Sequence, residues 1–116
     1  LSREITFRYR RGWTVRDLVK GSAGKPHIAR WHFEYSVEVV EEEERFVAAR
    51  GKARLGIYIA SEGKFRTRLY RDRKWLGTNP LHPNDPAPWV LDVRFGGAGD
   101  DALDTRFEIL KEKRGH

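Results

Sequence analysis

Arginine, histidine and tyrosine residues stand at alternate positions in three stretches of the sequence, where their chemistry suits an anionic ligand. A guanidinium group binds a phosphate through two hydrogen bonds and stacks on aromatic rings, and tyrosine supplies such a ring. Basic and aromatic side chains on the face of a sheet commonly hold single-stranded nucleic acid. A solvated strand face has a similar composition, so that interpretation stays open. The candidate binding residues are Arg30, His32, Arg54, Tyr58, Arg66, Arg68 and Tyr70.

Residue types that bind metals or form disulfides are scarce in the chain. It has no cysteine, which excludes thiol catalysis, disulfide bonds and cysteine-based zinc sites. His27 and His32 have opposite parity within one stretch, so they would face opposite ways, and no metal site is predicted. Asp100, Asp101 and Asp104 follow a glycine-rich stretch, but their spacing matches no calcium loop. A polar turn between the last two strands is the favoured interpretation.

Catalysis finds little support in the sequence. No serine or threonine stands in a nucleophile-elbow context, and the glycine-rich residues 96–99 are not followed by the Lys-Ser/Thr pair of a phosphate-binding loop. We therefore predict a protein that is not an enzyme and uses no cofactor. A carboxylate-dependent hydrolase is the minor alternative, because that chemistry needs only two carboxylates brought close in space.

The length and charge of the chain bound the class of protein. At 116 residues it suits a single domain, residues 1–116, and its net charge is +6 at pH 7. Residues 1–27 and 61–77 carry +5 and +4, whereas residues 28–60 and 78–116 carry −1 and −2. Basic blocks of this kind favour an anionic partner, either nucleic acid or an acidic lipid surface.

The sequence says little about compartment. No stretch is apolar over the roughly 20 residues of a membrane-spanning helix, so no transmembrane segment is predicted in this chain. No signal peptide is visible, and because the chain begins with Leu1 we expect a trimmed N-terminus. The lack of cysteine fits the cytoplasm and equally an exported bacterial protein, so both locations stay open, as does the oligomeric state.

Alternation of apolar and polar residues is the dominant pattern, and it predicts about seven strands. Residues 14–20 are ambiguous, because Val15, Leu18 and Val19 have helical spacing after a threonine cap, so one helical turn and a strand are equal alternatives. The predicted strands cover residues 5–9, 29–39, 46–48, 53–59, 65–69, 89–95 and 103–109.

Residues 28–72 are predicted to form a three-stranded antiparallel meander. A loop at 41–44 would pair Val39 with Phe46, and a bulge at Arg50 and Gly51 would restore the apolar phase. A three-residue loop at 61–63 would pair Ile59 with Phe65 and place Gly63 in the left-handed conformation. This register would bring all seven candidate binding residues onto one outer face.

The pattern as a whole indicates an all-β, single-domain antiparallel β-sandwich, with a small β-barrel as the alternative. A proline-rich connection at residues 79–88 would suit a crossing between the two sheets. For function, we predict a non-enzymatic interaction module, an accessory or assembly protein that acts through protein–protein contacts. The alternative is a polyanion binder that uses the basic, aromatic sheet face.

Overall fold

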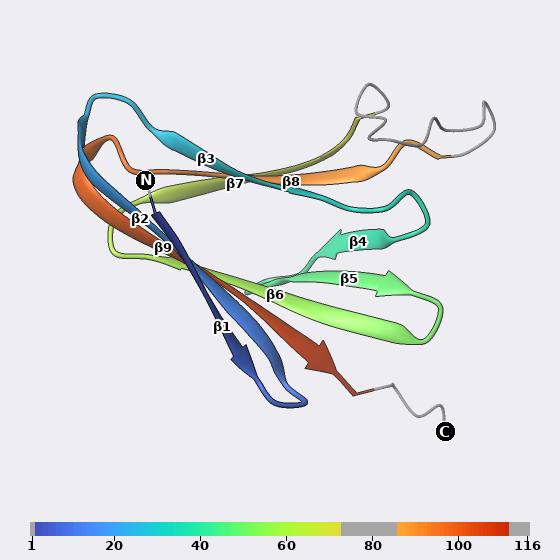
Figure 1. Ribbon diagram of the computed structural model, residues 1–116. Coiled ribbons are helices and arrows are strands. Elements are labelled where there is room, and N and C mark those ends of the chain that lie inside the picture. The colour runs from blue at the N-terminus through green and yellow to red at the C-terminus, as the bar shows by residue number, and fades with distance from the viewer. Residues whose placement is uncertain (1, 73–85, 112–116) are drawn as a thin grey trace.

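The computed structural model describes residues 2–72 and 86–111, which form two antiparallel sheets packed face to face (Figure 1). The sheets are open at their edges, so the predicted β-sandwich is confirmed and the barrel alternative is wrong. Nine strands are present in the described part: β1 (Ser2–Arg8), β2 (Gly12–Ala23), β3 (His27–His32), β4 (Glu38–Glu41), β5 (Phe46–Arg50), β6 (Ala53–Ser61), β7 (Phe65–Arg71), β8 (Trp89–Phe95) and β9 (Ala98–Leu110).

The larger sheet has the strand order β1-β2-β9-β6-β5-β4, and the smaller has the order β3-β8-β7. The links β2–β3, β6–β7 and β8–β9 all cross between the sheets at one end of the sandwich, whereas β3–β4 crosses at the other end (Figure 1). The smaller sheet is therefore assembled from strands that are far apart in the sequence, with β8 in its centre.

The predicted meander over residues 28–72 is only partly correct. Strands β4, β5 and β6 do follow one another in the larger sheet, but β3 and β7 belong to the smaller sheet on either side of β8. The expected hairpin at residues 61–63 is instead a crossing, and Gly63 does not have a positive φ. An alternating pattern satisfies a hairpin and a crossing equally, because both keep the same side chains facing the core.

Two details of the predicted register also differ. Val39 pairs with Ala48 rather than Phe46, a shift of two residues that leaves the inward face unchanged. No bulge interrupts β5 and β6, because Arg50 pairs with Ala53 across a two-residue turn. Gly51 has a φ of 59° at the first position of this turn, where a tight hairpin of this kind favours glycine.

Residues 14–20 lie in strand β2 and form no helical turn. Val15 and Val19 are both buried, and their spacing suits the inward face of a strand as well as a helix. The strand is favoured because β2 pairs with β1 on one side and with β9 on the other, whereas one helical turn would form few hydrogen bonds.

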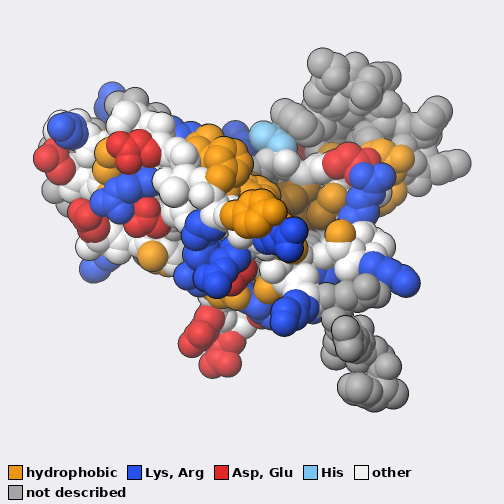
Figure 2. Space-filling model, turned by 60° about the horizontal axis from the view of Figure 1, so that its bottom comes forward, with side chains coloured by type: hydrophobic (Ala, Val, Ile, Leu, Met, Phe, Trp, Pro, Cys, Tyr) orange, Lys and Arg blue, Asp and Glu red, His pale blue; other side chains and the backbone are white. Residues whose placement is uncertain are grey.

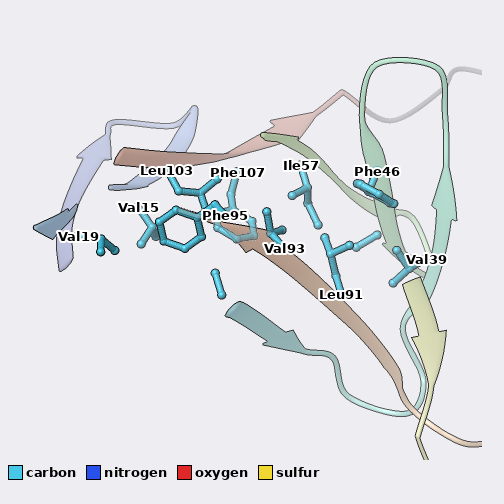
Figure 3. Close-up of a cluster of buried hydrophobic side chains, with 12 residues drawn as sticks. Val15, Val19, Val39, Phe46, Ile57, Leu91, Val93, Phe95, Leu103 and Phe107 are labelled. Atoms are coloured by element: carbon cyan, nitrogen blue, oxygen red, sulfur yellow. The ribbon is translucent and has the colours of Figure 1, made fainter. Parts of the chain in front are cut away.

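The core lies between the two sheets, where apolar side chains from both meet (Figure 3). Ile57 and Leu103 enter it from the larger sheet, and Leu91 and Val93 from the central strand of the smaller sheet; all four are fully buried. The Trp13 and Trp31 rings pack against Phe107 with centroid distances of 4.9 and 5.0 Å. This packing fixes which face of β8 points outward.

Asp101 joins two of the crossings at one end of the sandwich. Its carboxylate accepts hydrogen bonds from Gly63 N at 3.1 Å and Ser61 Oγ at 3.2 Å, both in or beside the β6–β7 link. It also accepts one from Gly96 N at 3.0 Å, in the β8–β9 link. A Cβ on Gly63 would meet Asp101 Oδ2 at 3.0 Å, so the close approach of this carboxylate accounts for the glycine.

The proline-rich connection falls mostly outside the described residues, which resume at residue 86. The strands that it joins, β7 and β8, are neighbours in the smaller sheet. The predicted crossing between sheets at residues 79–88 is therefore wrong.

Candidate functional site

An open groove of about 480 Å³ lies on the outer face of the smaller sheet. Its side chains come from β3, β8 and β7, because alternate residues of these strands point away from the core. Leu91 and Val93 are fully buried, whereas Asp92 and Arg94 between and beside them face outward. The register sets the outward residues in two neighbouring rows: Ile28, Arg94 and Arg66, then Arg30, Asp92 and Arg68.

Asp92 is the centre of a hydrogen-bonded cluster in the second row. Arg30 donates two hydrogen bonds to its carboxylate, from Nε to Oδ1 at 2.7 Å and from Nη2 to Oδ2 at 3.1 Å. The Tyr70 hydroxyl donates a third to Oδ2 at 3.0 Å. The Arg68 guanidinium lies over the Tyr70 ring, 4.5 Å from its centroid. These contacts hold Arg30, Tyr70 and Arg68 in place around Asp92.

The cluster has one stable protonation state near neutral pH. Hydrogen bonds from Arg30 are the main reason that the pKa of Asp92 lies below its usual value. Those hydrogen bonds are also the main reason that the pKa of Arg30 is raised. Burial, followed by the hydrogen bond to Asp92, raises the pKa of Tyr70. Asp92 and Arg30 are therefore charged and Tyr70 is neutral.

Three further arginines belong to the groove, and of these Arg68 lies opposite Asp92 and helps to lower the pKa of that carboxyl. Within residues 2–72 and 86–111, no carboxylate lies at ion-pair distance from Arg66, Arg68 or Arg94. Arg66 and Arg94 lie directly opposite each other in the β7–β8 register. Among the residues that the structure describes, four arginines and one aspartate line the groove, a formal charge of +3. This arrangement can bind an anion through several guanidinium groups at once.

The structure brings most of the predicted binding residues together. Arg30, Arg66 and Arg68 line the groove, and Tyr70 lies beside it through its contacts with Asp92 and Arg68. His32 shares an outward row with Tyr70, because both pair with Val90 from opposite sides. The prediction that Arg54 and Tyr58 belong to this surface is wrong, because both residues lie on β6 in the larger sheet.

Tyr58 forms a second basic and aromatic cluster on the larger sheet. Its ring lies over Gly56, where an added Cβ would meet Cε2 at 3.0 Å. Arg106 lies 4.4 Å from the ring centroid, and Arg45 donates from Nη1 to the hydroxyl at 2.9 Å. Lys and Arg side chains gather near the middle of the face in Figure 2. Here each arginine has an acidic neighbour: Glu42 for Arg45 and Glu108 for Arg106.

Sequence reasoning missed Asp92 and Arg94. Residues 89–95 were predicted as a strand with Leu91 and Val93 inward, so an outward position for both was within reach. What no local pattern shows is that β8 lies between β3 and β7. The missing information is the pairing of strands distant in sequence, which depends on how the whole core packs.

The three aspartates near the last turn serve separate structural contacts. Asp100 accepts a hydrogen bond from Gly21 N at 2.7 Å, and Asp104 one from Arg16 Nη1 at 2.8 Å. Asp101 accepts the hydrogen bonds described above. They lie within β9 rather than in the predicted turn. The described residues contain no group of three metal-ligating side chains that could hold an ion.

Fold and groove together define an all-β sandwich with an open, basic groove on its smaller sheet. None of the described residues forms a helix that could cross a membrane. Comparison with protein-family models, with curated proteins and with solved structures finds no match to this chain. Its function is therefore inferred from the chemistry of the groove.

Proposed function

We propose that the chain is a non-enzymatic binding module that holds single-stranded nucleic acid by its phosphates in the groove of the smaller sheet. The observation that carries this proposal is the pair of Arg66 and Arg94, directly opposite each other and without a carboxylate partner in the described part of the chain. Like charges in opposite positions repel each other. A phosphate between them would replace that repulsion with charge-assisted hydrogen bonds.

The shape and contacts of the groove favour a nucleic-acid backbone over the other ligands considered. A hollow of about 480 Å³ suits a narrow chain better than a broad lipid surface. The Tyr70 ring is half-buried and carries Arg68 over it, so it is not a free platform for a base. Binding through phosphates alone would depend little on base sequence.

The same contacts favour binding over catalysis. Asp92 is the one carboxylate that lines the groove in residues 2–72 and 86–111, and Arg30 and Tyr70 already donate hydrogen bonds to it. A hydrolase of the predicted kind would need a second carboxylate beside it. The predicted accessory role through protein contacts stays a prediction and concerns other surfaces of the molecule.

The proposal is tested by the salt dependence of binding to a fluorescein-labelled oligothymidylate, followed by fluorescence anisotropy. The variant Arg66→Gln/Arg94→Gln is expected to bind at least about tenfold more weakly. The slope of log affinity against log salt should fall by about 0.7, because the two arginines share one phosphate and each phosphate contact to a single strand contributes about 0.7.

The matched control is Arg45→Gln/Arg106→Gln on the larger sheet, which lowers the net charge by the same amount. It should bind almost as the unaltered protein does. Equal losses in the two double variants would show a response to net charge alone and would contradict a binding site in the groove. Tighter binding to phosphatidylserine vesicles than to the oligonucleotide would favour the lipid alternative.

A further inference from the structure

Strand β1 (Ser2–Arg8) forms one edge of the larger sheet, and in the described part of the chain it pairs only with β2. It contains neither glycine nor proline. Natural edge strands are commonly blocked by proline, by a bulge, by extreme shortness or by charged side chains, and of these β1 has only the charged side chains Arg3, Glu4 and Arg8. As far as residues 2–72 and 86–111 are concerned, its outer backbone groups are therefore free to pair with another strand.

The side chains of β1 that share the core-facing side of the sheet are exposed. Ile5 pairs with buried Val15 and Phe7 pairs with Trp13, so both point toward the side covered by the smaller sheet. Yet Ile5 is 54% exposed and Phe7 is 78% exposed, because the three-stranded sheet does not extend over this edge. A row of large apolar side chains on a free edge strand marks an interaction surface.

The opposite side of β1 carries Glu4, Thr6 and Arg8. Within the described residues Glu4 has no hydrogen-bond or ion-pair partner. Nε and Nη2 of Arg8 are buried and likewise make no hydrogen bond. The strand thus holds one unpaired acid and one incompletely bonded base, four residues apart and on the same side.

We propose that β1 pairs antiparallel with β1 of a second copy of this chain, centred on Thr6. In this register Ile5 lies opposite Phe7 of the second copy, and Glu4 lies opposite Arg8 of the second copy. The twofold axis repeats each pair, so every charge and every apolar side chain on β1 between residues 4 and 8 meets its complement.

Other registers are less complementary. A register centred between two residues, for example with Ile5 opposite Thr6 of the second copy, would set core-side residues opposite outer ones. The alternation of faces excludes it. Centring the pair on Ile5 would place Arg3 against Phe7 and leave Glu4 opposite Thr6. Arg3 is already engaged with Asp17, at 2.6 Å from Nε to Oδ1, so it has no need of a new partner. Charge complementarity therefore selects both the second copy as occupant and Thr6 as the centre.

Single cysteines test the register directly, because the chain has no cysteine of its own. A cysteine in place of Thr6 would face its own copy across the axis, within the distance at which a disulfide forms between neighbouring strands. Under mild oxidation Thr6→Cys is expected to give mainly disulfide-linked dimer on non-reducing gels. Glu4→Cys and Arg8→Cys, whose symmetry mates lie several residues away, should stay mostly monomeric. Equal cross-linking of all three would overturn the proposed register.

Charge exchange provides an independent test by sedimentation velocity. Glu4→Arg and Arg8→Glu should each raise the dimer dissociation constant at least about tenfold, because each places like charges opposite one another twice. The double variant Glu4→Arg/Arg8→Glu should restore dimerisation. A double variant no better than the single ones, or an unaltered protein that sediments as a monomer even when concentrated, would overturn the proposal. Circular dichroism of each variant separates lost pairing from lost folding.

Discussion

Replacing Asp101 with alanine is expected to destabilise the fold by about 3 kcal/mol, because three hydrogen bonds from two crossings depend on this carboxylate. Each of these hydrogen bonds contributes a net value of about 1 kcal/mol, because water can partly replace the bonds to the exposed link. At about 4 °C per kcal/mol for a domain of this size, the melting temperature should fall by about 12 °C.

Thermal unfolding followed by circular dichroism measures this effect, and two variants make it specific. Asp101→Asn keeps one acceptor oxygen but turns an amide toward one donor, so its loss should be intermediate. Asp100→Ala removes the same charge from the neighbouring residue and, among the described residues, one hydrogen bond, which comes from Gly21 N. If Asp101→Ala lowered the melting temperature no more than Asp100→Ala, the role of Asp101 in joining the crossings would be refuted.

Two further substitutions probe the backbone and the groove. Gly12→Ala should cost at least about 3 kcal/mol, because φ is 140° and the new Cβ would lie 1.9 Å from the Phe107 carbonyl oxygen. Gly51→Ala, with positive φ but open space, is its control in chemical denaturation and should cost only about 1 kcal/mol. Asp92 has a folded pKa below its unfolded value, so its stabilising effect is present above the unfolded pKa of about 3.8 and is lost as pH falls through the folded one. In Asp92→Asn the free energy of unfolding should therefore fall less steeply as the pH is lowered into the acid range. An unchanged dependence on pH would show that the contact with Arg30 contributes little.

The sequence predicts which side of its strand a residue points to more reliably than it predicts which strands pair with each other. Arg30, Arg66 and Arg68 were expected to point outward on strands, and they do, because the alternation of faces is a local property of each strand. The sandwich class followed for the same reason, since many alternating segments without a long helix leave few other folds.

The neighbours of each strand could not be predicted in the same way. Tyr58 and Arg54 were placed beside Arg66 and Arg68 on the assumption that β6 and β7 form a hairpin. The link between β6 and β7 is short enough for either a hairpin or a crossing, and the crossing is stabilised by Asp101, which lies 38 residues beyond Gly63. A distant carboxylate of this kind leaves no trace in the local pattern.

Strand β1 shows a different limit. Its alternation correctly predicted a strand, but alternation alone suggests that the apolar face is buried. Whether that face is covered depends on the relative width of the two sheets, six strands against three, which only the complete topology reveals. Exposure of Ile5 and Phe7 was therefore outside the reach of sequence reasoning.

The order of strands in the smaller sheet would link the proposed ligand binding to folding. The groove takes its rows from residues 28–30, 66–68 and 92–94, three segments that meet only after the chain has crossed between the sheets. An unfolded chain holds the same arginines but not their spacing, so the proposed ligand of the groove would bind the folded form selectively. By mass action, ligand at about 100 times its dissociation constant would add about 2.7 kcal/mol to the free energy of unfolding. Occupancy of the groove would thus stabilise the folded sandwich against unfolding.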